Sequence, residues 1–248
     1  MRTGVYDLCV SEALTRLIDP GDLVVDVGAN VGYMTNLSAF RVGATGRVVA
    51  VEPHPEIYEE LKANVALLSA SRSRGRIDTM RTAVSDVSGE AFIVDSRGFA
   101  GNRGSAQLHV GEDSPPDGLP RHRVSVRTLD DILATASSVG VLKIDVEEHE
   151  LQVLRGAGSL LAQKRVRDVV FEDHRSPPTP VTNFLEKSGY RIFRLHQRFL
   201  GLRAEPLGRR SSTSLWDPPS YVATSDPDRA RRRLTGRGWS TLRAHRSL

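Results

Sequence analysis

The sequence predicts a doubly wound α/β fold, in which helices cover both faces of a mainly parallel β-sheet. Short apolar runs alternate with longer stretches whose apolar residues recur every three or four positions, the pattern of strands alternating with helices. The strand-like runs are rich in Val, Ile and Leu, as expected of parallel strands buried on both faces. Several of these runs end on an acidic residue, and open α/β sheets bind ligands at the carboxyl ends of their strands.

The composition fits one α/β domain with short appendages. The chain has 248 residues, of which 39% are hydrophobic, and no apolar run reaches the ~20 residues of a membrane span. Cys9 is the single cysteine, so an internal disulfide is excluded, which is compatible with a reducing cytoplasm. We expect a cytoplasmic protein with an N-terminal helical segment (1–20), a main domain (21–224) and a basic C-terminal helix or tail (225–248).

Basic residues are concentrated near the C-terminus. Residues 191–248 contain 13 arginines and four acidic residues, whereas the net charge of the whole chain is +4. Such a segment could bind nucleic acid or an anionic membrane. We favour a solvated surface, because the arginines lack the interleaved aromatic residues on which single-stranded nucleic acids stack.

The first predicted strand leads into a glycine-rich turn. The apolar residues 23–25 are followed by Asp26, and Gly28, Asn30 and Gly32 then interrupt the chain. Glycine lets the backbone approach a ligand without a Cβ clash, and asparagine also accepts left-handed dihedrals. The turn is neither a G-x-G-x-x-G fingerprint nor a P-loop. An acid before it suits a ligand that carries an ammonium and a sulfonium; a tight turn in an unrelated α/β protein is the alternative.

The second predicted strand also ends on an acid. Glu52 follows the apolar run that begins at Arg47, and it lies 26 positions after Asp26. In a βαβ unit, an acid at this place reaches the ribose hydroxyls of a nucleotide-like ligand. A helix cap is the alternative, because a helical pattern begins at Pro55. The spacing favours the ribose role.

The remaining elements follow the same alternation up to the C-terminal region. Further strands are expected over residues 77–85, 91–94, 124–127, 139–146, 167–171 and 190–195, with 215–216 or 221–223 as a final edge strand. Residues 96–120 are rich in glycine, proline and polar residues and contain no such pattern. Loops of this length are usually functional or disordered. We interpret this one as a mobile cover over the substrate, with disorder as the alternative.

Several motifs occur together in one order along the chain. They are Asp26-Val-Gly-Ala-Asn-Val-Gly-Tyr33, Val51-Glu-Pro-His-Pro55, Ala83-Val-Ser-Asp86, Thr128-Leu-Asp-Asp131, Lys143-Ile-Asp-Val-Glu147, Glu150 and Leu154-Arg-Gly-Ala157. With these motifs the chain resembles the FkbM-type family of S-adenosylmethionine-dependent methyltransferases, over about residues 5–195. The resemblance implies the class I methyltransferase Rossmann-like sheet with an antiparallel last strand, and S-adenosylmethionine as the cofactor. It also implies methyl transfer, usually to a hydroxyl of a sugar, glycan or polyketide in secondary metabolism. The implied cofactor site comprises Asp26, Gly28, Asn30, Gly32, Glu52 and Ala83.

Two departures from the family pattern bear on the site. Glu148 stands where the family commonly has the glycine of Val-Glu-Gly-x-Glu, and His149 follows it. Residues 96–120 match no part of the pattern. The first departure concerns the geometry of a turn beside the chemistry, and the second concerns the acceptor.

A hydroxyl acceptor needs a base or a metal ion to take its proton. Glu147 and His174, just past the ends of two strands, are the expected catalytic pair, and Asp145 would orient the donor or the base. Further acidic and histidine residues surround them in the sequence: His149, Glu150 and Glu172. We expect no metal, because no metal-ligand spacing stands out. The alternatives are an amine or nucleic-acid methyltransferase and a non-catalytic donor-binding scaffold; a small-molecule or glycan acceptor is the expected partner, and a homo-oligomer is compatible with the sequence.

Overall fold

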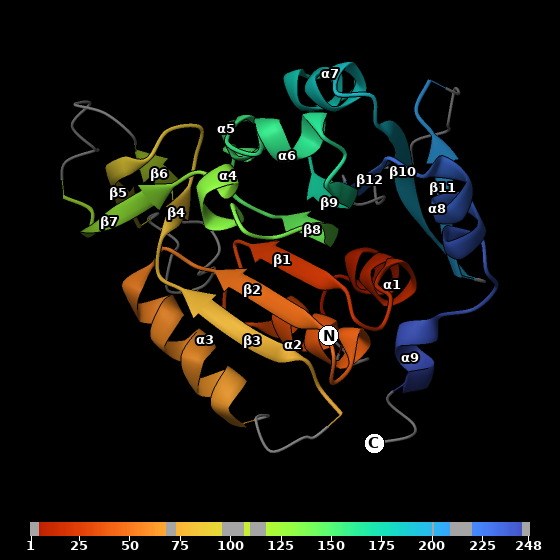
Figure 1. Cartoon of the computed structure of the whole chain (residues 1–248), viewed down its shortest axis with the longest axis horizontal. Coiled ribbons are helices and arrows are strands. Elements are labelled where there is room, and N and C mark those ends of the chain that lie inside the picture. Colours follow the sequence, from red (N-terminus) through yellow and green to blue (C-terminus); the bar gives the residue numbers. More distant parts are fainter. Residues whose placement is uncertain are drawn as a thin grey trace.

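The computed structural model describes residues 5–67, 73–95, 107–109, 118–199, 201–208 and 220–244. Its main sheet has the strand order β11-β10-β12-β9-β8-β1-β2-β3 (Figure 1). The strands are β1 (Leu23–Val27), β2 (Arg47–Val51), β3 (Arg76–Met80), β8 (Val139–Ile144), β9 (Val166–Glu172), β10 (Arg191–Arg198), β11 (Gly201–Pro206) and β12 (Ser220–Thr224). Neighbours from β3 to β9 are parallel, so the predicted doubly wound, mainly parallel sheet is confirmed.

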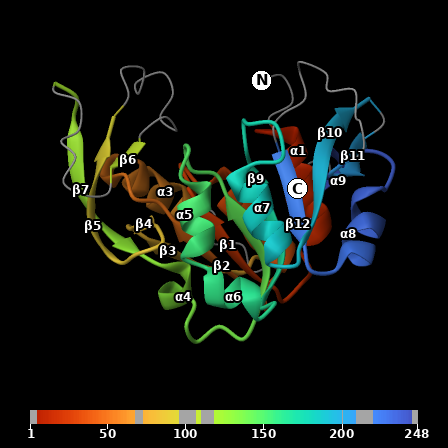
Figure 2. The ribbon, with the colours of Figure 1, turned by 90° about the horizontal axis from the view of Figure 1, so that it is seen from above.

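The sheet is buried on both faces because its side chains alternate between two helical layers. Val24 packs into the core with α1 and α2, whereas Val25 packs into the core with α5, α6 and α7. Figure 2 shows α5, α6 and α7 gathered together over one part of the sheet. The helices are α1 (Leu8–Leu17), α2 (Tyr33–Val42), α3 (Pro55–Leu67), α4 (Leu129–Ile132), α5 (Glu150–Arg155), α6 (Gly158–Ala162), α7 (Pro180–Lys187), α8 (Pro227–Leu234) and α9 (Ser240–Ala244).

A second sheet lies at the opposite end of the molecule from α8 and α9 (Figure 1). It has the order β4-β7-β5-β6, with β4 (Ala83–Val84), β5 (Gly89–Val94), β6 (Gln107–His109) and β7 (Arg121–Arg127). The single strand expected over residues 77–85 is therefore wrong. β3 ends at Met80, and Thr82 donates its hydroxyl to the Ser125 carbonyl (2.9 Å), which ties the following residues to β7 instead of β2.

The long segment between β5 and β7 is not a continuous loop. Residues 107–109 form β6, which pairs antiparallel with β5, so the expectation of a strand-free segment over 96–120 is wrong at this point. The expected mobile cover otherwise falls on residues 96–106 and 110–117, which lie outside the described residues.

The antiparallel last strand is confirmed, but its predicted place at the edge is wrong. β12 lies between β9 and β10 and is antiparallel to both. Tyr221 and Val222 are buried there, as an apolar run in a sheet interior should be. The edge is β11, which the sequence did not indicate. Residues 215–216 lie outside the described part of the chain.

The two ends of the chain pack against each other. Glu12 of α1 is buried, and its carboxylate accepts hydrogen bonds from the backbone of Ser240 and Thr241 (2.8 Å each). Arg229 of α8 forms ion pairs with Asp19 and with the buried Asp168. Part of the C-terminal basic charge is therefore neutralised inside the fold; the predicted division at residues 20 and 224 stays a prediction. No helix in the described ranges is long and apolar enough to cross a membrane.

Candidate functional site

The carboxyl ends of β1, β2, β8 and β9 surround a pocket of about 300 Å³, which the second sheet closes on one side. Nine residues were assigned from the sequence to the cofactor site or to catalysis, and seven of them line this pocket: Gly28, Asn30, Glu52, Ala83, Asp145, Glu147 and His174. Asp26 and Gly32 are not among the lining residues. The fold thus brings together residues that are up to 146 positions apart, although their roles toward a ligand stay predictions.

The glycine turn after β1 is shaped by close packing. Gly28 has a φ of +74°, and a Cβ at this position would lie 1.9 Å from the backbone oxygen of Asp145. Gly32 has a φ of +89°, and its Cβ would lie 2.6 Å from Leu61 of α3. Asn30 takes a φ of +49°, one of the few non-glycine residues with positive φ in the described chain. Gly28 therefore lets β1 and β8 meet at the pocket, and Gly32 lets α2 begin against α3.

Asp26 lies beneath the turn and not in the pocket wall. Its carboxylate is 1% exposed, accepts the Thr35 hydroxyl (2.6 Å) and lies 3.0 Å from the amine of Lys143. That amine also donates to the Gly28 carbonyl (2.8 Å) and lies 3.4 Å from Asp145. Burial alone would lower the pKa of Lys143, but the two carboxylates raise it above its ordinary value. A charged Lys143 thus ties β1, β8 and the turn together.

Glu52 is held by the backbone of both neighbouring segments. One carboxylate oxygen accepts from the Asn30 amide and the other from the His54 amide, each at 2.9 Å. The residue is 6% exposed, and burial raises the pKa of Glu52 to about 7, despite these two hydrogen bonds to its charged form. The turn after β1 and the loop after β2 are therefore joined through one carboxylate in the pocket wall.

The expected catalytic pair occupies the open side of the pocket. Glu147 lies in the exposed turn between β8 and α5, and His174 follows β9 with 74% of its side chain exposed. The Nε2 atom of His174 lies 3.9 Å from a carboxylate oxygen of Glu172, which is beyond hydrogen-bond distance. Burial, and then the charge of Asp145, raise the pKa of Glu172 to about 8.

The lining residues Tyr6 and His54 were assigned no role from the sequence. Tyr6 reaches the pocket from the segment before α1 and packs edge-on against Tyr33, with ring centroids 6.1 Å apart. His54 lines it from the loop after β2. Tyr6 could not be placed without knowing where α1 docks. For the supporting residue Lys143, the available signal was a lysine in an otherwise apolar strand of a chain that has four lysines.

The profile of the methyltransferase FkbM domain matches residues 26–192, which include most of the residues just described. The chain belongs to the FkbM methyltransferase family. It is 33% identical over 180 residues to the 31-O-demethyl-FK506 methyltransferase FkbM of Streptomyces tacrolimicus, covering 62% of this chain and 66% of that protein, slightly under two thirds of its length. It is 27% identical over 199 residues to the hexuronic acid methyltransferase AglP of Haloferax volcanii, covering 74% and 71%.

A solved structure supports the fold assignment. The crystal structure of a methyltransferase FkbM from Methylobacillus flagellatus KT superposes with a TM-score of 0.50 at 17% identity. The match covers 90% of this chain and 56% of that one. At this level of identity the likeness concerns the fold alone.

The departure of this FkbM domain at Glu148 leaves the turn intact. Glu148 has a φ of +59°, so a non-glycine residue takes the left-handed conformation that glycine adopts without strain. The next residue, His149, is half-buried, and its Nε2 lies 3.0 Å from the Ser85 hydroxyl. Burial lowers the pKa of His149. His149 is therefore a packed, hydrogen-bonded residue and not a solvated surface side chain.

Proposed function

We propose that this protein transfers a methyl group from S-adenosylmethionine to a hydroxyl group of a small-molecule acceptor of the sugar, glycan or polyketide type. The observation that carries the proposal is the acidic pocket at the strand ends of an FkbM domain. Four carboxylates line it: Glu52, Asp145, Glu147 and Glu172. Among the described lining residues there is neither lysine nor arginine, a charge balance that suits a cationic sulfonium and disfavours a ligand rich in phosphates.

We call the part of the pocket wall formed by Gly28, Asn30, Glu52 and Ala83 the closed side; its residues fit this cofactor. Gly28 and Asn30 hold the turn at positive φ in the pocket wall, and Ala83 adds a small side chain from the second sheet. Glu52 would receive the ribose hydroxyls, since its carboxylate lies at the end of the second strand of the βαβ unit. When bound, the cofactor supplies an activated methyl group on its sulfonium.

The residues of the open side would bind the acceptor and take its proton. Glu147 or His174 accepts the hydroxyl proton, and Asp145, which lines the same pocket, orients the donor or the base. A carboxylate oxygen of Glu172 lies 3.9 Å from Nε2 of His174, and its raised pKa of about 8 lets Glu172 hold a proton near neutral pH. The rest of the rate enhancement comes from positioning the two reactants in line.

The choice of acceptor rests on the relatives. One is named for 31-O-demethyl-FK506 and the other for hexuronic acid, so neither name refers to a nucleic acid. We infer an acceptor of the sugar, glycan or polyketide class here, and methyl transfer to a panel of sugar acids, glycosides and macrolide alcohols, followed as release of S-adenosylhomocysteine, would identify the member.

Calorimetry of cofactor binding tests the proposal directly. Glu52→Ala is expected to weaken S-adenosylmethionine binding at least about tenfold, or about 1.4 kcal/mol, because the ribose loses its acceptor. Glu56→Ala is the matched control, since Glu56 is an exposed glutamate at the start of α3 and does not line the pocket. Equal affinities of the two folded variants would exclude the ribose role, and no binding to the wild type would refute the proposed function.

A further inference from the structure

Two histidines and an aspartate converge at the junction between the main sheet and the second sheet. We propose that His54, Asp95 and His122 form a binding site for a divalent transition-metal ion of the Zn²⁺ type. One ligand atom from each residue lies within 4.8 Å of the other two. Metal binding at these three residues would not depend on methyl transfer.

Both imidazoles face the same carboxylate oxygen. The Nε2 atom of His54 lies 3.0 Å from Oδ1 of Asp95, and the Nε2 atom of His122 lies 3.8 Å from that same oxygen. The two rings meet edge-on, with centroids 4.7 Å apart and planes at 71°. A His–Asp hydrogen bond accounts for His54, but 3.8 Å is too long for a second one. A shared ion accounts for the approach of both rings.

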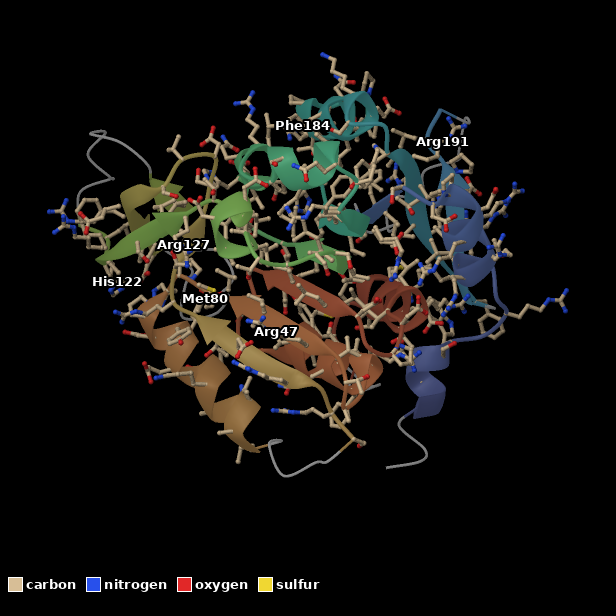
Figure 3. All side chains as sticks on the ribbon, viewed as in Figure 1. Arg47, Met80, His122, Arg127, Phe184 and Arg191 are labelled. Atoms are coloured by element: carbon tan, nitrogen blue, oxygen red, sulfur yellow. The ribbon has the colours of Figure 1, made fainter. Side chains whose placement is uncertain are left out.

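The three ligands come from three separately anchored segments. His54 lies in the loop between β2 and α3, and its ring is fully buried. Asp95 directly follows β5, and its amide donates to the Pro120 carbonyl (3.0 Å). His122, labelled in Figure 3, lies near the start of β7 and is paired in register with Ile93 of β5. The β5–β7 pairing therefore presents Asp95 and His122 together toward His54.

The donor set selects the class of ion. Zn²⁺ binds imidazole nitrogen and carboxylate oxygen at roughly 2.0–2.2 Å, which places tetrahedral ligand atoms roughly 3.4 Å apart. The observed separations of 3.0 and 3.8 Å bracket that spacing. Mg²⁺ and Ca²⁺ prefer oxygen ligands alone, so two imidazoles disfavour them. Three protein ligands leave a fourth position for water, as in sites that are not purely structural.

The ion would connect the second sheet to the closed side of the pocket. His54 lies two residues after Glu52, and its amide donates to the Glu52 carboxylate (2.9 Å). Asp95 directly follows β5, which carries the pocket residue Ile93, and His122 lies opposite Ile93 on the neighbouring strand β7. Metal binding would therefore stabilise the attachment of the second sheet to the loop that holds Glu52.

The test uses the full chain, freed of metal with EDTA and titrated with ZnCl₂ alone. We expect one Zn²⁺ per chain by calorimetry and elemental analysis, and a higher melting temperature with Zn²⁺ but not with Mg²⁺. His122→Gln should weaken Zn²⁺ binding at least tenfold. Because the His122 side chain is partly exposed, this variant should fold, as circular dichroism can verify. His174→Gln is the matched control: it removes a histidine beside Glu172 in the same pocket and should leave Zn²⁺ affinity unchanged.

Each alternative outcome is decisive. The proposal is overturned by a wild type that binds no Zn²⁺, by unchanged affinity in His122→Gln, or by a loss confined to His174→Gln, which would move the ion to the Glu172 side. Asp95→Asn provides a second variant that keeps the shape of the side chain. Co²⁺ loaded in place of Zn²⁺ should show an absorption spectrum of low-symmetry nitrogen and oxygen coordination in the wild type, and that spectrum should be lost in His122→Gln.

Discussion

The closed and open sides of the pocket differ in how far their residues are buried and hydrogen-bonded. On the closed side, the lining residue Glu52 and the two residues that support the wall, Asp26 and Lys143, are each less than a tenth exposed, and all are engaged by internal hydrogen bonds or ion pairs. On the open side, Glu147 and His174 are exposed. A rigid, pre-organised wall suits a cofactor that is the same in every turnover. An exposed wall leaves room for the acceptor and lets substitutions change chemistry without unfolding the protein.

The largest expected effect is on the open side, in catalysis. The more important of Glu147→Ala and His174→Ala should lose about 10²–10⁴-fold in kcat, because general-base work is removed, while S-adenosylmethionine affinity is retained. Glu148→Gln is the control, since this exposed neighbour does not line the pocket. Single-turnover rates and calorimetry on the same preparations would separate chemistry from binding. Full activity in both alanine variants would leave positioning alone as the source of catalysis.

The next effect is on the closed side, in stability. Lys143→Met should lower the free energy of unfolding by about 3–5 kcal/mol, because it leaves the carboxylate of Asp26 buried without its cation. Lys62→Met is the matched control: Lys62 pairs with Glu59 on the exposed surface of α3 and should cost less than about 1 kcal/mol. Urea denaturation measures both.

A second variant sharpens this test. Adding Asp26→Asn to Lys143→Met should recover part of the lost stability, because the unpaired charge is then removed. A Lys143→Met protein as stable as Lys62→Met would show that the closed side is not held by this ion pair.

The two sides also differ in what could be predicted from the sequence: the positions of residues at strand ends could, but their long-range partners could not. Asp26 and Glu52 were located because each follows an apolar run, and a strand end is a local pattern. The bond from Lys143 to Asp26 was not predictable, because it depends on β8 pairing with β1 across 117 positions. His54, Asp95 and His122 meet only because a second sheet exists. Two of its strands were predicted singly, over 91–94 and 124–127, but the pairing that joins them into a sheet was not. Local patterns located the residues, and strand order decided their partners.

The stability of the protein should depend on pH through Glu172. Its pKa rises from an ordinary 4.5 to about 8 through burial, Asp145 and Asp7, although Lys143 opposes the shift. Between these values the folded state retains a proton that the unfolded state has lost, so this group's stabilising contribution falls as pH rises from about 4.5 to 8. Glu172→Gln should flatten the decline in urea midpoint across that range, whereas Glu186→Gln, on the exposed surface of α7, should leave it unchanged. Parallel pH profiles of the wild type and Glu172→Gln would contradict the assignment.

The smallest expected effect concerns the strained turn on the open side. Glu148 holds a φ of +59°, which costs a non-glycine residue roughly 1–2 kcal/mol, and Glu148→Gly removes that cost. Glycine also gains about 0.5–1 kcal/mol of freedom in the unfolded chain, so the net gain in stability should be at most about 1.5 kcal/mol. The same substitution at Glu186, within α7, should instead lose about 0.5–1 kcal/mol, because helical dihedrals favour residues with a Cβ. Urea midpoints that move in opposite directions would establish that the open side stores backbone strain next to Glu147. If Glu148→Gly were destabilised as much as Glu186→Gly, contacts of the Glu148 side chain would have to outweigh its backbone conformation.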